Sequence, residues 1–250
     1  MHRLILGGGI LFLTLKRRTL VFWGLTLIAL LCGAARLFLP AALPVFQSEG
    51  QGGATYVLDA GHGGEDGGAV SADGVKESDI NLAITRDLNA LLQFLGYNTV
   101  LTRGDDVSIH SDGAETLRQK KVSDLKNRVA LVNATPNAVL VSIHQNSLPT
   151  VPSVHGAQVF YGKIRSSAAL ALSVQDALNA GVNSGNEKHE KKIDPSIYLM
   201  KNVSCPAILI ECGFLSNAAE TASLQTREHQ KTIAVAIAAG ILNTEEREAP

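Results

Sequence analysis

Three short apolar runs in this chain each end on a residue that can bind a metal ion or move a proton. Residues 56–58 lead to His62, residues 139–143 lead to His144, and residues 207–210 lead to Glu211. Short apolar runs between turn residues are typical of buried strands. In an open parallel sheet, sites form just beyond the carboxyl ends of strands. The pattern therefore predicts that three polar groups far apart in sequence meet in one crevice, as in an enzyme.

Amphipathic segments separate these runs and define the fold class. Apolar residues from Ile80 to Leu95 keep helical spacing, with Ser78 as the expected cap and Gly96 as the stop. The same alternation continues, with helices expected near 122–132, 166–180 and 228–242, strands at 98–102 and 156–161, and loops at 104–121 and 186–192. The alternation predicts an α/β fold with a mainly parallel, twisted central sheet and helices on both faces.

The N-terminal part reads as a membrane segment rather than as part of this fold. Thr19 to Ala35 is an uncharged stretch of 17 residues, at the lower limit for a bilayer span. Three basic residues, 16–18, precede it, which predicts that the tail stays in the cytoplasm and the rest is exported. A cleavable signal peptide, giving a secreted protein, is the alternative.

We therefore divide the chain into three parts. Residues 1–46 are expected to form a cytoplasmic tail and one transmembrane helix or signal segment, 47–55 a Gly-rich linker, and 56–250 a catalytic domain. The chain carries 22 basic and 23 acidic side chains, which give no overall field for holding nucleic acid. Nucleic acid is accordingly not expected as a partner.

Zinc chemistry explains the residue types at the strand ends. Catalytic zinc sites commonly use three His, Asp or Glu ligands and keep a fourth position open. His62 and His144 supply two of these, and nearby carboxylates offer a third: Asp59, Glu65, Asp66 and Glu77. We favour Glu77 because it lies at the mouth of a predicted helix instead of on a glycine loop. A carboxylate that only stabilises the helix N-terminus is the alternative for this residue.

Glu211 is expected at the end of a buried strand, where an unpaired carboxylate is costly. It would either form a salt bridge, to Arg128 or a lysine, or act as the general base and acid of a hydrolase. Near a zinc ion one such carboxylate suffices for hydrolysis near neutral pH.

Four sequence blocks, in order, resemble the signature of zinc-dependent N-acetylmuramoyl-L-alanine amidases: LDAGHGG at 58–64, KE at 76–77, SIHQN at 142–146 and IECGFLSN at 210–217. The resemblance extends over about residues 56–243. It implies that His62, Glu77 and His144 bind one zinc ion per chain and that Glu211 is the catalytic carboxylate. It also implies hydrolysis of the amide between N-acetylmuramic acid and L-alanine in peptidoglycan, a carbon–nitrogen bond other than a peptide bond.

The expected substrate contacts are Arg128, Gln145 and Asn146. Gln145 departs from the family, which commonly has a small residue after the histidine, and is expected to change contacts at the site rim. The overall plan is most similar to the spore-cortex, germination-specific type, which removes stem peptides so that muramic δ-lactam can form. The phrase SIYLMKN at 196–202 supports this subtype.

Three questions stay open at this level. The chain could retain the fold as a wall-binding or scaffolding protein without activity, or it could be a zinc peptidase that cuts within the stem peptide. An activating protein partner is also compatible with the sequence, which gives no means of identifying it. Peptidoglycan is the partner that the resemblance implies, and the membrane is the partner that the N-terminal segment predicts.

Overall fold

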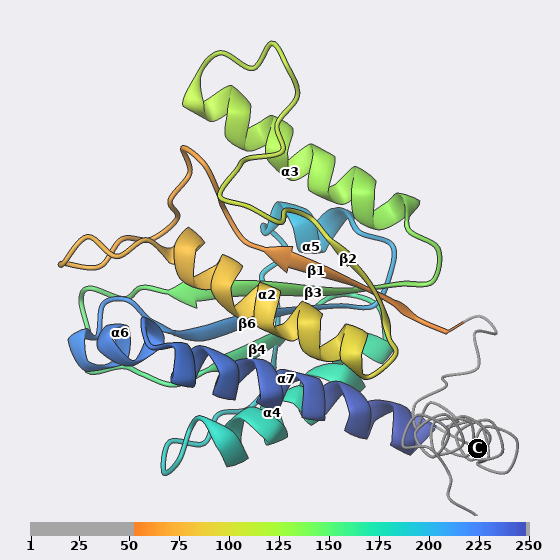
Figure 1. Ribbon diagram of the computed structural model, residues 1–250, viewed down its shortest axis with the longest axis vertical. Coiled ribbons are helices and arrows are strands. Elements are labelled where there is room, and N and C mark those ends of the chain that lie inside the picture. Colours follow the sequence, from red (N-terminus) through yellow and green to blue (C-terminus); the bar gives the residue numbers. More distant parts are fainter. Residues whose placement is uncertain (1–52, 249–250) are drawn as a thin grey trace, which may run out of the picture. The chain divides into compact units, whose positions relative to one another are not determined.

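A six-stranded sheet runs through residues 53–248, the part of the chain that this computed structural model describes (Figure 1). The strand order is β2-β1-β3-β6-β4-β5. The strands are β1 (Thr55–Ala60), β2 (Asn98–Leu101), β3 (Ala138–Asn146), β4 (Gln158–Tyr161), β5 (Lys191–Lys192) and β6 (Ala207–Phe214). All neighbouring pairs are parallel except β4 and β6, which are antiparallel. The prediction of a mainly parallel sheet is confirmed, with one antiparallel pairing that makes the sheet mixed.

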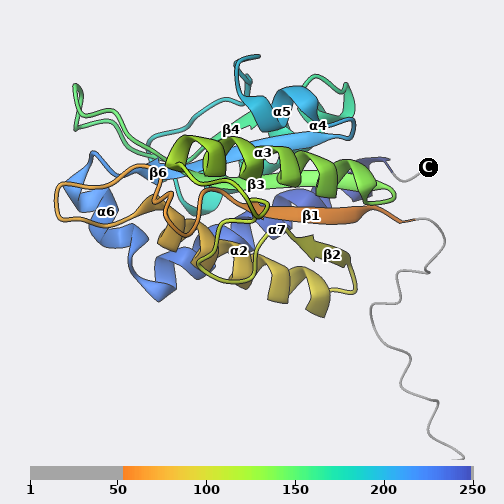
Figure 2. The ribbon, with the colours of Figure 1, turned by 90° about the horizontal axis from the view of Figure 1, so that it is seen from above.

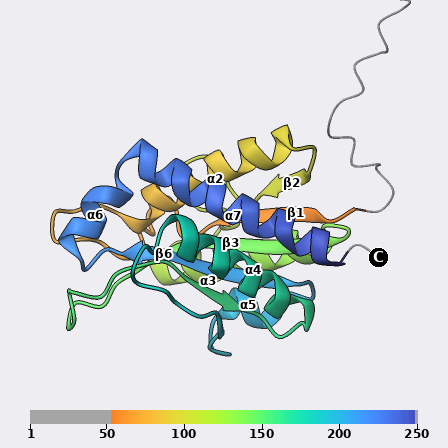
Figure 3. The ribbon, with the colours of Figure 1, turned by 90° about the horizontal axis from the view of Figure 1, so that it is seen from below.

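Helices cover both faces of the sheet, as predicted. One face carries α2 (Glu77–Phe94), α4 (Ser166–Gly181) and α7 (Arg227–Glu248), which lie side by side in Figure 3. The other face carries α3 (Leu117–Ala134) and the short α5 (Tyr198–Asn202), as Figure 2 shows. Helix α6 (Ala218–Leu224) follows β6 at the carboxyl end of the sheet. The second face is therefore covered by fewer helices than the first, and one of them, α5, has only 5 residues.

The chain changes face between β1 and β3, and this places the site. From β1 the chain passes through α2 on one face to the edge strand β2. It then returns through α3 on the other face to β3, on the opposite side of β1. The point where connections diverge to opposite faces is where ligands bind in open α/β sheets. His62, just after β1, and His144, near the end of β3, flank this point.

Two helix starts differ from the prediction. Helix α2 begins at Glu77, and its first turn carries Glu77 and Asp79, whose negative charges stabilise a helix N-terminus. Ser78 is therefore a buried helical residue and not the cap. Helix α3 begins at Leu117, inside the segment predicted as a loop, because Thr116 and Gln119 form a reciprocal capping box.

The predicted membrane segment, Thr19 to Ala35, lies outside the described residues. Within residues 53–248, no helix has the length and apolarity needed to cross a bilayer. Strand β1 begins at Thr55, the last residue of the predicted linker.

A buried ion pair joins the strand ends to α3. Arg128, on α3, donates to Asp59 of β1 at 2.5 Å and to Asp124 at 2.6 Å. Asp59 also accepts from Thr102 at 2.8 Å and from Ser142 of β3 at 2.6 Å. Both partners are almost fully buried, at 2% and 1% exposed. The pair therefore ties two strands, one helix and the segment after β2 into one unit.

Arg128, expected as a substrate contact, lines the cleft but is bound within the fold, and that contact stays a prediction. Besides its two carboxylates, its guanidinium donates to the carbonyls of Ala60 at 2.8 Å and His62 at 2.7 Å. The bond to His62 holds the backbone of the loop that follows β1. Burial and these bonds commit the guanidinium to the fold, so we assign Arg128 to holding this loop.

A first test concerns the packing of α4 against α7. A Cβ added at Gly240 of α7 would lie 2.4 Å from the Cα of Val174 on α4. For Gly240→Ala we expect overpacking to outweigh the gain in helix propensity, with a net loss of about 1–2 kcal/mol in the free energy of unfolding. Urea unfolding measures this. Gly104→Ala, at a site with open space, is the control, and equal stability of the two variants would contradict the close packing.

A second test uses the pH dependence of stability. Burial alone would raise the pKa of Asp59, but Arg128 and the Ser142 hydroxyl outweigh it and hold the pKa at about 2. Because this value is below that of the unfolded chain, the stabilisation is complete above about pH 4 and is lost as the pH falls towards 2. The free energy of unfolding of the wild-type protein should fall between about pH 4 and pH 2. In Asp59→Asn we expect this fall to be smaller by about 2 kcal/mol, measured by urea unfolding at each pH.

The exposed Asp73→Asn serves as the control and should leave the decline unchanged. If Asp59→Asn is too unstable to measure, Ser142→Ala removes one donor to the carboxylate and raises the folded-state pKa of Asp59. The fall in the free energy of unfolding should then be smaller and should end at a higher pH. A decline identical to that of the wild type in both variants would show that Asp59 is not the residue responsible.

Candidate functional site

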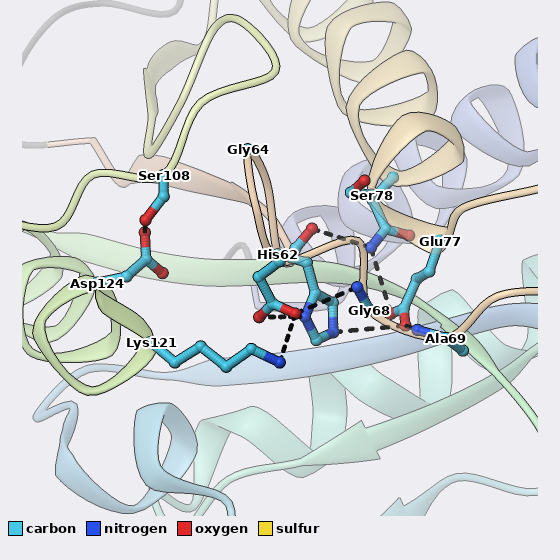
Figure 4. Close-up of polar contacts among 12 residues, drawn as sticks. His62, Gly64, Gly68, Ala69, Glu77, Ser78, Ser108, Lys121 and Asp124 are labelled. Atoms are coloured by element: carbon cyan, nitrogen blue, oxygen red, sulfur yellow. Dashed lines mark hydrogen bonds and ion pairs between the residues drawn. The ribbon is translucent and has the colours of Figure 1, made fainter. Parts of the chain in front are cut away.

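His62 is held by the backbone of a tight turn. It has a left-handed backbone conformation, with φ 61°, which is uncommon for a residue with a side chain. Strain of this kind persists where surrounding contacts fix it, and it concentrates at functional sites. Here Arg128 binds the His62 carbonyl, and the ring Nδ1 lies 2.9 Å from Asp66 Oδ2. The Asp66 contact leaves Nε2 facing Glu77 (Figure 4), 3.4 Å from its Oε2.

Glu77 is the first residue of α2, and donors hold both of its oxygens. Oε2 accepts from the backbone N–H of Ala69 at 2.8 Å. Oε1 accepts from the backbone N–H of Gln145 at 3.1 Å and from the side chain of Asn81 at 3.3 Å. The carboxylate is 4% exposed and turned towards the two histidines. Its position is thus fixed by groups from three separate segments.

His144 completes the cluster from β3. Its Nδ1 lies 2.8 Å from Glu77 Oε1, and its ring meets that of His62 edge to face, with 5.2 Å between centroids. The absence of a side chain at Gly61 makes room for it, because a Cβ there would lie 2.3 Å from the imidazole. At Gly68 a Cβ would likewise lie 2.5 Å from Glu77 Oε2. The glycines of this loop therefore allow close approach to the cluster.

The structure brings together the three side chains that the sequence singled out for a metal. The ligand atoms of His62, Glu77 and His144 all lie within 4.8 Å of one another. The other candidate carboxylates are engaged elsewhere: Asp59 with Arg128, Glu65 with Lys120, and Asp66 with His62 and Lys121 (Figure 4).

The electrostatics of the cluster favour a cation. Asp66 and Glu77 raise the pKa of His62 to about 9, although burial opposes this. Burial likewise opposes the negative form of Glu77, but the two histidines hold the pKa of this carboxyl well below its usual range. The groups are thus arranged to hold positive charge at their centre. Two imidazoles and one carboxylate also form a ligand set that suits zinc.

Glu211 lies beside this cluster and has no salt-bridge partner among the described residues. It pairs directly with His144 in the register of β6 and β3. Burial raises its pKa to about 7, and its Oε2 has no hydrogen-bond partner within residues 53–248. The salt bridge to Arg128 or a lysine, considered from the sequence, is not observed. Its carboxyl is free to exchange a proton near neutral pH.

A cleft of about 640 Å³ opens over the cluster and Glu211. Asn146, one of the expected substrate contacts, lines it, and its role stays a prediction. One wall is apolar and comes from α3, α5 and β6: Leu125, Ile197, Tyr198, Leu199 and Leu209. Ile197 and Tyr198 are 39% and 40% exposed, so they present apolar surface to the cleft. An amphipathic substrate can therefore lie between this wall and the cluster.

Gln145 lines the cleft with little exposed surface, and the rim contact expected from the sequence stays a prediction. It is 3% exposed, and its side chain turns inward to donate to Asn81 at 3.2 Å. Alternation along β3 explains this, since neighbouring residues of a strand point to opposite faces. His144 faces the cleft, so the side chain after it faces the packed side.

Sequence reasoning missed two residues that support the cluster. Asp66 was weighed as a ligand and instead binds the His62 ring, four residues before it. Asn81 was not considered, although it follows Glu77 by four residues and so shares a helix face with it. Each of the two residues follows a proposed ligand by four positions, and this spacing is the sequence signal that points to them.

Comparison with known proteins agrees with this geometry. The model of the N-acetylmuramoyl-L-alanine amidase family matches residues 57–243. The germination-specific N-acetylmuramoyl-L-alanine amidase of Bacillus subtilis is 35% identical over 190 residues, which cover 76% of this chain and 79% of that protein.

Two solved structures are also similar. The CwlD amidase of Clostridioides difficile, in complex with the GerS lipoprotein, is 40% identical with a TM-score of 0.74, covering 78% of this chain and 100% of that one. The catalytic domain of CwlV, an amidase of Bacillus (Paenibacillus) polymyxa, is 29% identical with a TM-score of 0.65, covering 77% and 98%. Since the family match runs from β1 into α7, the chain belongs to the N-acetylmuramoyl-L-alanine amidases, enzymes that act on peptidoglycan.

Proposed function

We propose that this amidase is zinc-dependent and hydrolyses the amide between the lactyl group of N-acetylmuramic acid and L-alanine. One observation carries the proposal: a buried carboxylate without a salt-bridge partner, Glu211, lies beside the cluster of His62, Glu77 and His144. Burying an unpaired carboxylate costs free energy, and a role in the reaction explains why this one is kept. Hydrolysis of an amide requires both a base and an acid, and one carboxyl can serve as each in turn.

His62, Glu77 and His144 would hold the zinc ion. Bound there, zinc would lower the pKa of a water molecule to about 7 and polarise the scissile carbonyl. The protein's own contribution is to fix the three side chains before any ion binds. Asp66 orients His62 through Nδ1, and Ala69 and Asn81 hold the two oxygens of Glu77.

Glu211 would carry the proton. It takes one from the attacking water as the new carbon–oxygen bond forms, and gives it to the nitrogen of L-alanine as the carbon–nitrogen bond breaks. A pKa raised to about 7 suits a group that must accept and donate near neutral pH. The sugar and peptide on either side of the bond would lie along the cleft, with Ile197 and Tyr198 offering apolar contact and Asn146 a polar one.

We further propose that the substrate is spore-cortex peptidoglycan and that removal of its stem peptides leads to muramic δ-lactam. The support is the similarity to the germination-specific amidase of Bacillus subtilis and to the CwlD amidase. Residues 196–199, within the segment that resembles this subtype, line the cleft.

Location and assembly are also proposals. Residues 19–35 would anchor the chain in the cell membrane, with the catalytic domain on the outer side of the membrane, unless the segment is cleaved and the protein secreted. The CwlD structure contains a lipoprotein, GerS. We propose that this chain also works with a protein partner, which would explain any need for assistance in metal binding or activity.

The test of the mechanism is Glu211→Gln in the whole chain, loaded with zinc. The amide has nearly the same shape and cannot take a proton, so we expect turnover to fall about 10²–10⁴-fold while zinc content is unchanged. Release of stem peptides from muropeptides and the metal content of the purified protein are the two measurements. Glu228→Gln, an exposed position on α7, is the matched control and should retain full turnover.

Full turnover in Glu211→Gln would contradict the proposed mechanism. Loss of zinc together with turnover would make Glu211 a ligand instead of the proton carrier.

Mass spectrometry of the products separates the amidase from its alternatives. We expect glycan with intact muramic acid and peptides that begin with a free L-alanine. A zinc peptidase would instead leave L-alanine attached to the sugar and cut further along the stem. A scaffold would yield no product from a chain that is shown to contain zinc, even when the partner protein is supplied, and this result would contradict catalysis.

A further inference from the structure

Two buried amides, Asn81 and Gln145, lie behind Glu77 and take no direct part in the proposed reaction. Asn81, on α2, is 0% exposed, and Gln145, on β3, is 3% exposed. Gln145 lines the cleft, but its side-chain nitrogen is engaged with Asn81. The pair therefore calls for an explanation from its own contacts.

The orientation of the Asn81 amide follows from what it touches. Its Nδ2 donates to the carbonyl of Gly61 at 3.1 Å and to Glu77 Oε1 at 3.3 Å. Both are acceptors only, so the nitrogen must face them and Oδ1 must face away. Gln145 then donates its Nε2 to that oxygen at 3.2 Å. Each amide has one allowed orientation, and each fixes the other.

This arrangement leaves one atom unsatisfied. Gln145 Oε1 is buried and has no hydrogen-bond partner within residues 53–248. Burying an unpaired carbonyl oxygen lowers stability, so this end of the side chain does not stabilise the fold. The useful end of Gln145 is therefore the nitrogen that binds Asn81.

We propose that Gln145 is a positioning residue that acts through Asn81 on Glu77 and thereby strengthens zinc binding. This inference rests on the proposed zinc site. With Gln145 present, Asn81 must present its N–H to Glu77 Oε1, beside the Gln145 backbone N–H at 3.1 Å. Without that donor, the oxygen end of the Asn81 amide is no longer held, and the bond from Asn81 Nδ2 to Glu77 Oε1, already 3.3 Å long, weakens. Partners of metal ligands affect metal affinity in this way in other sites.

The test is Gln145→Met, a change that keeps the size and the backbone N–H and removes the side-chain donor. Zinc affinity of the whole chain is measured by competition with a chelator of known affinity. We expect it to weaken about 10–100-fold. The unfolding temperature of the metal-free protein should change little, because the variant removes one unpaired buried oxygen, Gln145 Oε1, and leaves another, Asn81 Oδ1. The visible spectrum of bound Co²⁺ should also change, since it reports ligand geometry.

Gln175→Met is the matched control. Gln175, on α4, is 1% exposed, and its amide bonds to the backbone of Ala157 and Val159. We expect this variant to be less stable with zinc affinity and Co²⁺ spectrum unchanged. The opposite pattern of the two variants separates positioning of Glu77 from a general effect on the fold.

A double-mutant cycle tests the path through Asn81. Because Gln145 acts through Asn81, Gln145→Met should weaken zinc binding no further when Asn81→Ala is already present. Affinity losses that multiply would overturn this path. Wild-type affinity in Gln145→Met would overturn the positioning role alone, whereas a wild-type chain that takes up no zinc would overturn the proposed zinc site and this role with it.

Discussion

The buried pair of Asp59 and Arg128 is the interaction on which the rest of the site depends. A charge buried to this extent must be paired and hydrogen-bonded, and here the bonds come from β3, α3 and the segment after β2. The same guanidinium holds the His62 carbonyl at 2.7 Å. Replacing the pair by apolar residues would leave that carbonyl without this donor. We infer that the pair fixes the loop after β1 and does not merely add stability.

The cluster of His62, Glu77 and His144 is held in place by the Asp59–Arg128 pair and by a second set of hydrogen bonds around it. His62 adopts a left-handed backbone conformation that only a well-fixed loop maintains, and Asp66, itself bound to Lys121, orients its ring. Glu77 is held by donors on both oxygens. These contacts fix the orientation of both side chains, as the supporting partners of metal ligands do in other sites.

The sequence allowed the three strand ends and the fold class to be predicted, because these follow from hydrophobic pattern and from strand direction. The choice of Glu77 rested instead on its place at the mouth of a predicted helix and on the resemblance to the amidases. It did not reveal the inward turn of Gln145, since a strand that ends at a site can place successive residues in the cleft and in the core. Nor did it reveal that Arg128 is buried: a charged residue on a weakly amphipathic helix reads as exposed until its partner Asp59 is known. The antiparallel pairing of β4 is likewise a long-range choice that local pattern does not encode.

The spacing between the cluster and its proton carrier is a property of the backbone. His144 and Glu211 are direct partners across β3 and β6, and paired residues of adjacent strands are separated by about 4.8 Å. A shift of one residue in this register would turn Glu211 into the packed face and bring an apolar neighbour to the cleft. Both residues lie on the face that α3 and the five-residue α5 cover. Because α5 is short, the ends of the strands stay uncovered there, and this forms the cleft. The pairing register of β3 and β6 then places Glu211, the proposed general base, inside it.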